Sequence, residues 1–209
     1  MLKKFNSWLG IAGLLCLTVI AKGQVVSDTP VKGTPYMQEA YVDGVIYYAS
    51  KNLTAPIRYN AYQDLIEYKQ DGKALVLDAN SKIQKVQLGD EAFVPQKYNL
   101  NGKSKLGYFA LLDSGKVMLF AKRKIVFSPV QKGRALDGVG DMPAEFKRTA
   151  DEFYYRIGDG ELQELSNIKS MIATFPDKQS EVTQYAKKEK ISPKKEKEVI
   201  MLVQYYNSL

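Results

Sequence analysis

The chain has 209 residues, of which 45% are hydrophobic and 25% are charged, with 30 Lys and Arg against 23 Asp and Glu. This composition is typical of globular domains and excludes a disordered, collagen-like or disulfide-stapled chain. The chain has no His. Because imidazole is the side chain that titrates near neutral pH without perturbation, this excludes most hydrolase triads and the commonest metal ligand.

Residues 1–23 have the pattern of a secretory signal peptide. A positively charged start precedes an uncharged apolar run over 8–21, and a small-x-small ending is followed by Gln24. The run is shorter than the about 20 residues that a membrane-spanning helix needs. We therefore expect cleavage before Gln24 and export, with residues 24–35 as a flexible lead-in.

Removal of this leader changes the chemistry and the charge of the chain. It takes away Trp8 and Cys16, and it leaves 27 basic and 23 acidic residues. The smaller excess of positive charge argues against nucleic-acid binding. An exported chain without cysteine has no disulfides and depends on a packed core, which about 190 residues are enough to form.

Residues 36–165 have the pattern of short strands separated by turns. The clearest turn is Asp71-Gly72, because these residues suit the positive φ angles of a two-residue hairpin. Asp43-Gly44 interrupts an apolar run and predicts a bulge or a tight turn. Turn signals recur about every 8 to 12 residues, which favours an antiparallel meander, sandwich or partly closed barrel over a parallel sheet. Strands are expected at 41–49, 57–59, 65–69, 73–77, 83–88, 92–97, 107–112, 116–127, 152–157 and 161–165, with further hairpin turns at 113–115 and 158–160 and an irregular loop at 129–142.

Residues 166–209 change to a period of about 3.6, which predicts three short helices. Ser166 is the expected cap of the first helix, and Pro176 ends it. The second helix is expected within 177–190, and Ser192 caps the third. Because short helices with one apolar face are not stable alone, we expect them to pack on one another or on the sheet. The apolar faces are Ile168, Met171, Ile172 and Phe175, then Val182, Tyr185 and Ala186, then Val199, Leu202, Val203 and Tyr206.

Two features predict a ligand-binding site. Tyr59 and Tyr62 lie at either end of a polar corner between two expected strands, and Tyr offers rigid amphipathic contact area. Lys122, Arg123 and Lys124 form the densest basic stretch and would attract an acidic polysaccharide, an anionic lipid or an acidic protein surface. Structural explanations stand beside this one, since Tyr fits half-buried strands and basic residues protect edge strands from pairing.

The densest acidic loop contains Asp137 and Asp141, with Glu145 nearby. Two carboxylates are enough for glycoside hydrolysis, and oxygen-rich loops bind calcium, but only fragments of a calcium-loop pattern are present. Turn-forming acids in a surface loop explain the same residues. Asp137 and Asp141 are therefore the alternative, enzymatic site. We expect no metal, no cofactor and no other catalytic residue.

Several stretches resemble a known group of proteins. These are 57–62 with 65–69, 175–178 with 202–207, and the Ala-Lys-Gly-Gln segment at the expected cleavage site. Together they resemble small exported proteins that are common in Bacteroidota. The resemblance implies a location in a Gram-negative cell envelope, in the periplasm or at the cell surface, and it implies no catalytic residue.

We therefore expect an exported α+β protein with a strand-rich domain over 36–165 and a helical region over 166–209. Its expected function is non-enzymatic binding or a structural role, with an envelope protein, a glycan or an anionic lipid surface as partner. We expect no nucleic-acid partner and no transmembrane helix in the mature chain. One alternative is a glycan-directed hydrolase that needs no His. Another is an assembly factor that docks through its C-terminal helices.

Overall fold

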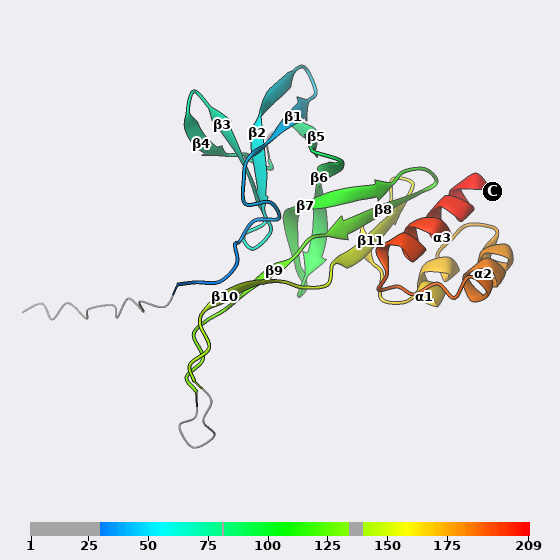
Figure 1. Cartoon of the computed structure of the whole chain (residues 1–209). Coiled ribbons are helices and arrows are strands. Elements are labelled where there is room, and N and C mark those ends of the chain that lie inside the picture. Colours follow the sequence, from blue (N-terminus) through cyan, green and yellow to red (C-terminus); the bar gives the residue numbers. More distant parts are fainter. Residues whose placement is uncertain (1–29, 81, 134–139) are drawn as a thin grey trace, which may run out of the picture.

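The computed structural model describes residues 30–80, 82–133 and 140–209 (Figure 1). The expected leader and the first part of the lead-in lie outside the described residues. The strands are β1 (Val42–Tyr48), β2 (Asn52–Asn60), β3 (Leu65–Gln70), β4 (Lys73–Val76), β5 (Ile83–Leu88), β6 (Glu91–Leu100), β7 (Lys103–Asp113), β8 (Val117–Lys122), β9 (Ile125–Ser128), β10 (Glu145–Arg148), β11 (Glu152–Ile157) and β12 (Gln163–Glu164). The helices are α1 (Ile168–Ala173), α2 (Gln179–Lys188) and α3 (Glu196–Ser208).

Ten of the strands form one open antiparallel sheet in the order β12-β11-β8-β7-β6-β5-β1-β2-β3-β4. Two meanders, β1 to β4 and β5 to β8, are joined by the pairing of β1 with β5. The remaining strands, β9 and β10, form a separate ribbon that extends away from the sheet in Figure 1. The predicted α+β class, with an antiparallel strand-rich part and three C-terminal helices, is confirmed, and the sheet is neither a sandwich nor a closed barrel.

Two hairpin turns are made by residues with positive φ angles. Asp71 and Gly72 have φ of 51° and 75°, so the turn predicted between β3 and β4 is confirmed. Asn101 and Gly102 have φ of 52° and 76° between β6 and β7. This second turn was not among the predicted ones, although Asn-Gly is a strong hairpin signal. It allows β6 and β7 to pair from Phe93↔Ala110 to Leu100↔Lys103.

Gly44 lies within a continuous strand, so the predicted bulge or turn at Asp43-Gly44 is wrong. The register of β1 with β2 is unbroken through this position, and the irregularity in its pairing with β5 falls at Tyr47/Tyr48. A Cβ at Gly44 would lie 2.5 Å from the carbonyl oxygen of Gln87. Glycine is therefore needed here because a neighbouring backbone approaches closely, a reason that the sequence pattern does not show.

The strand expected over 116–127 is divided in the structure. β8 ends at Lys122, and β9 begins at Ile125 and leaves the sheet to pair with β10. Residues 30–35, part of the expected lead-in, are held against this ribbon, since the backbone of Lys32 bonds with Ala144 and Phe146.

The main core lies on the sheet face that the helices cover. The predicted apolar face of α3, from Val199 to Tyr206, is fully buried. Asn207 fastens this helix to β8, because its side chain accepts from the backbone N–H of Val117 at 2.9 Å and donates to the carbonyl of Val117 at 3.0 Å. The three helices lie together at one end of the sheet in Figure 1.

Two helix starts differ from the prediction. Asn167, not Ser166, caps α1, since its side chain accepts from the backbone N–H of Ser170 at 2.7 Å. α3 begins at Glu196, after a turn in which Ser192 Oγ accepts from the N–H of Lys194 at 3.3 Å. Within the described residues, no helix is both long enough and apolar enough to cross a membrane.

A second, smaller hydrophobic cluster lies on the opposite face of the sheet. It contains no helix residue. Its buried members come from β6, β7, β8 and β11, and they are Val94, Phe109, Phe120 and Tyr154, with Tyr98, Leu111, Met118 and Leu162 packed against them. We call this the outer cluster.

Candidate functional site

Asp64, at the polar corner between β2 and β3, forms an ion pair with the buried Lys122, and the side chain of Asp64 is itself 23% exposed. The carboxylate of Asp64 also accepts a hydrogen bond from the hydroxyl of Tyr59 at 2.7 Å. The ammonium of Lys122 lies 4.6 Å from the ring centroid of Phe109 and 5.3 Å from that of Tyr98. We call these contacts, together with the backbone of Tyr108, the Asp64 junction.

The Asp64 junction supplies hydrogen bonds that the sheet lacks at this point. On the side of β7 that faces β8, the pairing of the two strands reaches only as far as Ala110, so the backbone of Tyr108 has no strand partner there. The N–H of Tyr108 therefore donates to Asp64 Oδ1 at 3.2 Å, and its carbonyl accepts from Lys122 Nζ at 3.0 Å. Because buried backbone groups need such partners, the ion pair has a structural role.

The electrostatics of the junction follow from its burial. Burial lowers the pKa of Lys122 below its ordinary value, and the attraction of Asp64 offsets only part of this effect. Burial, and next the nearby Asp64 carboxylate, raises the pKa of Tyr59 far above its ordinary value. Asp64 itself has φ of 59°, a left-handed conformation that Asp adopts more readily than most residues.

Arg123 is also buried, with an exposed fraction of 6%. Its guanidinium meets three carboxylates from three parts of the chain, those of Glu91, Asp151 and Glu196, with the Asp151 contact at 2.8 Å. Burial alone would lower the pKa of Arg123, but the hydrogen bond that it donates to Glu196 and the charges of Glu91 and Asp151 raise it. Arg123 thus ties the start of α3 to the sheet.

The five predicted ligand-binding residues do not form one exposed surface. Tyr59 and Lys122 are buried in the Asp64 junction, and Arg123 is buried among carboxylates. Lys124 is half exposed and pairs with Glu152 at 2.6 Å. Tyr62 is 47% exposed and packs against Phe127 and Phe146 of the ribbon, with ring centroids 6.3 and 5.2 Å away.

The alternative acidic site is described only in part, because Asp137 lies outside the described residues. Asp141 is exposed and pairs with Lys132 at 2.7 Å. That hydrogen bond and the one from the N–H of Gly133 lower the pKa of Asp141, so it remains a carboxylate. Among the residues that the structure describes, no group of three or more acidic residues is placed to hold a metal ion.

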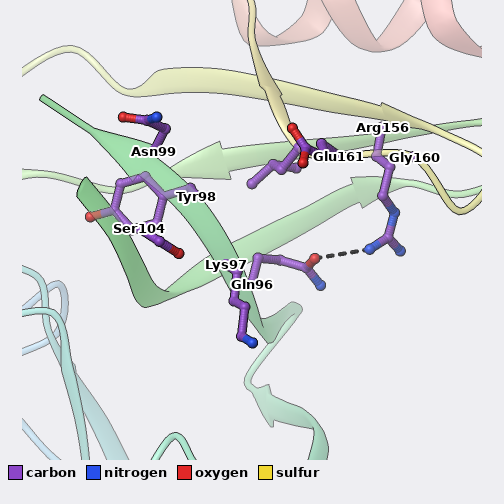
Figure 2. A pocket seen from close by; sticks show the side chains of 9 residues that line it. Gln96, Lys97, Tyr98, Asn99, Ser104, Arg156, Gly160 and Glu161 are labelled. Carbon is purple, nitrogen blue, oxygen red and sulfur yellow. Dashed lines mark hydrogen bonds between the residues drawn. The ribbon is translucent and has the colours of Figure 1, made fainter. Parts of the chain in front are cut away.

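A cavity of about 510 Å³ opens on the outer face of the sheet, beside the outer cluster (Figure 2). It is lined by residues 96–99 of β6, Ser104 of β7, Arg156 of β11 and the turn residues 160–162. The lining combines amide, hydroxyl, cationic and carboxylate groups with one aromatic ring. We call it the outer cavity. Because most of its lining residues belong to strands of one sheet, their side chains are held on a rigid support.

Tyr98 is the aromatic wall of the outer cavity. Its ring meets Phe109 and Tyr154 edge-on, at centroid distances of 5.1 and 6.1 Å, and Phe109 meets Tyr154 in the same way at 5.0 Å. Such edge-to-face contacts fix the orientation of a ring. Burial, followed by the charges of Asp64 and Glu152, raises the pKa of Tyr98, so the phenol stays protonated.

Arg156 differs from the other arginines that the structure describes. Arg58, Arg123 and Arg148 each pair with a carboxylate. Arg156 pairs with none within the described residues, and it donates only to Gln96 Oε1 at 3.0 Å and to the Met118 sulfur at 3.1 Å. Figure 2 shows the contact with Gln96 across the cavity.

The Nε atom of Arg156 is buried without a hydrogen-bond partner. An amide and a thioether are weak partners for a cation, whereas a guanidinium matches a carboxylate with two parallel hydrogen bonds. The outer cavity therefore presents a fixed, half-buried cation with unused capacity for an anionic oxygen.

Sequence reasoning did not identify the residues of this cavity. Gln96 and Arg156 are 60 residues apart, and neither lies in a charged cluster or a motif. The pairing of Met118 with Arg156 places the guanidinium on the outer face, and strand order alone brings Gln96 near it. The chain has no significant match among known protein families, curated proteins or solved structures.

Proposed function

We propose that this chain is an exported envelope protein that binds an acidic polysaccharide in the outer cavity without converting it. The observation that carries the proposal is the half-buried guanidinium of Arg156, which has no carboxylate partner within the described residues. A uronic-acid carboxylate would supply the missing anionic partner.

The other groups of the cavity favour a sugar over a simple anion. Glu161 is exposed and lines the cavity, so a ligand of several negative charges would be repelled at one side. Sugar hydroxyls both donate and accept hydrogen bonds, and they suit the carboxylate of Glu161 and the polar groups of Asn99 and Ser104. The fixed ring of Tyr98 offers a flat apolar surface for a sugar face.

The lining favours binding over hydrolysis. Glycoside hydrolysis by the usual route needs two carboxyl groups that flank the scissile bond. Glu161 is the one acidic residue among those that line the outer cavity. A volume of about 510 Å³ lies within the range of about 300–1,000 Å³ that small-molecule sites occupy, enough for a short stretch of a glycan.

The experiment is calorimetric titration of the purified full chain with oligogalacturonate and with a neutral oligosaccharide of the same length. We expect binding of the acidic ligand alone. Arg156→Gln is expected to weaken it by about tenfold or more, since a hydrogen bond to a charged group contributes about 1.5–3 kcal/mol. Arg148→Gln, which removes an exposed and carboxylate-paired cation, is the matched control and is expected to bind as the unmodified chain does. Equal binding by the Arg156 variant, or no preference for the acidic ligand, would contradict the proposal.

Export has its own test. Protein recovered from the cell envelope is expected to begin at Gln24, and Edman degradation or mass spectrometry of the intact chain measures this directly. Recovery of a chain that still carries residues 1–23 would contradict processing at this site.

A further inference from the structure

A groove of about 580 Å³ lies between α1 and α2, in the helical region. Its floor is apolar and consists of Ile168 and Ile172 from α1, Ala186 from α2, and Ile191 beyond it. Ile172 is buried, and the other three are half-buried. The apolar surface is therefore recessed between two helices and does not project from the molecule.

The charged residues that line this groove all have the same sign. They are Lys169, Lys187 and Lys190, and no acidic residue lines it. None of the three takes part in an ion pair within the described residues. By contrast, Lys178, Lys188 and Lys195, three of the five other lysines of the helical region, each have a carboxylate partner. The groove thus concentrates cations that lack anions.

Lys190 adopts a conformation that glycine adopts more easily. It follows α2 with φ of 53°, and the N–H of Ile191 donates to the carbonyl of Ala186 while that of Lys190 donates to the carbonyl of Lys187. This is the Schellman pattern, in which glycine is the usual residue at the left-handed position. A lysine there costs stability, and it places an ammonium at the edge of the groove.

We propose that this groove binds an acidic amphipathic segment of a partner protein. The apolar side chains of the segment would cover Ile168, Ile172 and Ile191, and its carboxylates would meet the three lysines. Helix-in-groove recognition of this kind uses an apolar face laid between two helices. The site lies on the helical region, on residues that take no part in the outer cavity, so it stands independently of the proposed glycan binding.

The shape of the groove favours a protein segment over a lipid surface. Binding to a membrane surface requires apolar side chains that project into the acyl region, with cations arranged beside them. Here the apolar floor is recessed, and Lys169 and Lys187 belong to the two different helices that form its sides. A peptide can enter such a concave surface, whereas a planar bilayer cannot reach its floor.

The test uses a fluorescein-labelled helical peptide of 18 residues, with Leu on one face and Glu on the other, and the purified full chain. Fluorescence anisotropy is expected to show saturable binding that weakens with added salt. A peptide with Lys in place of every Glu is expected not to bind. Lys169→Glu with Lys187→Glu is expected to weaken binding by about tenfold, since each reversal replaces an attraction with a repulsion.

The matched control is Lys194→Glu with Lys197→Glu, which makes the same change of charge on lysines outside the groove. It is expected to change the affinity by less than about twofold. Equal loss in both double variants would show attraction by net charge alone and would overturn the site. Sedimentation with phosphatidylglycerol vesicles, without binding of the acidic peptide, would also overturn it in favour of a lipid surface.

Lys190→Gly gives a further test in which stability and binding move in opposite directions. Glycine relieves the left-handed conformation, so the melting temperature is expected to rise. Removal of one ammonium is expected to lower the affinity for the acidic peptide by about twofold to fivefold. A rise in melting temperature with unchanged affinity would remove Lys190 from the site.

Discussion

Lys122 and Arg156 project from the same face of the sheet, from the neighbouring strands β8 and β11, but their surroundings differ. Lys122 in the Asp64 junction meets a carboxylate, a backbone carbonyl and two aromatic rings. Arg156 in the outer cavity meets an amide, a thioether and the ring of Phe120, whose centroid lies 5.8 Å away, and its Nε has no hydrogen-bond partner. A buried cation with a full set of partners stabilises the fold, whereas one that lacks an anion is the better candidate for binding a ligand.

Among variants of the Asp64 junction, the largest effect should come from Asp64→Asn. The variant leaves the Lys122 ammonium buried beside a neutral amide, while Asn still tolerates the left-handed backbone. Breaking a buried ion pair at one partner costs about 3–5 kcal/mol, so we expect a loss of about 3 kcal/mol in the free energy of unfolding, measured by urea denaturation. Asp64→Asn combined with Lys122→Met should recover part of it. A loss below about 1 kcal/mol would contradict the structural role of the junction.

Gly107→Ala should have the next largest effect. A Cβ at this position would overlap the Asp64 carboxylate and the Lys122 ammonium, and it would lie 3.1 Å from the ring of Tyr98. Overpacking of this kind costs about 1–3 kcal/mol. Gly140→Ala, which would meet no atom within 4 Å, is the control, with an expected change below about 0.5 kcal/mol. Similar results for both variants in urea titrations would show that the junction is not tightly packed.

Tyr59→Phe should lower the free energy of unfolding by about 1 kcal/mol at neutral pH, because it removes the hydrogen bond to Asp64. It should also change how the free energy of unfolding depends on pH above neutrality. Burial, and next Asp64, raises the pKa of Tyr59 above its ordinary value in the folded chain. The contribution of the protonated Tyr59 to the free energy of unfolding is therefore complete below about pH 10, and it declines at higher pH, where the unfolded chain releases the proton.

Urea titrations between about pH 9 and 11 measure this decline, which should be shallower in the variant because Phe does not titrate. The exposed Tyr62, replaced in the same way, is the control and should change the free energy of unfolding at neutral pH by less than about 0.5 kcal/mol. An identical slope for Tyr59→Phe would contradict the link between Tyr59 and Asp64.

Arg156→Gln should have the smallest effect on stability, within about 0.5 kcal/mol, because the guanidinium has no carboxylate to leave unpaired. Its effect should fall on ligand affinity. Arg123→Gln is the contrasting variant, because it removes the buried cation that meets Glu91, Asp151 and Glu196, of which, within the described residues, only Asp151 keeps another partner, Arg148, and it should lower the free energy of unfolding by about 3 kcal/mol or more. Thermal denaturation of the two variants side by side measures the difference, and a large loss for Arg156→Gln would place it with the structural cations.

Much of the local structure could be predicted because it depends on neighbouring residues. The Asp71-Gly72 turn follows from backbone preferences of those two residues, and the buried face of α3 follows from its helical period. The Asn101-Gly102 turn was missed in spite of its local signal, and other errors arose where the tertiary environment decided the outcome. Gly44 stands inside a strand because the backbone at Gln87 approaches it.

The candidate site was harder to predict than the fold. Lys122, Arg123 and Lys124 form one basic cluster in the sequence, but only Lys122 lies in a strand, and Arg123 and Lys124 form the link from β8 to β9, where the chain leaves the sheet. In the structure Lys122 meets Asp64, Arg123 meets Glu91, Asp151 and Glu196, and Lys124 meets Glu152. A count of charges along the chain contains no information about these partners.

The sequence by itself determined the division into strands and helices, the Asp71-Gly72 hairpin and the lack of any imidazole, because these depend on residue type and on short-range spacing. The tertiary structure alone decided which cations are neutralised and which remain without an anion. Lys122 and Asp64 are 58 residues apart, and Arg156 and Gln96 are 60 apart. Electrostatic interactions depend on distance in space, and strand order sets that distance.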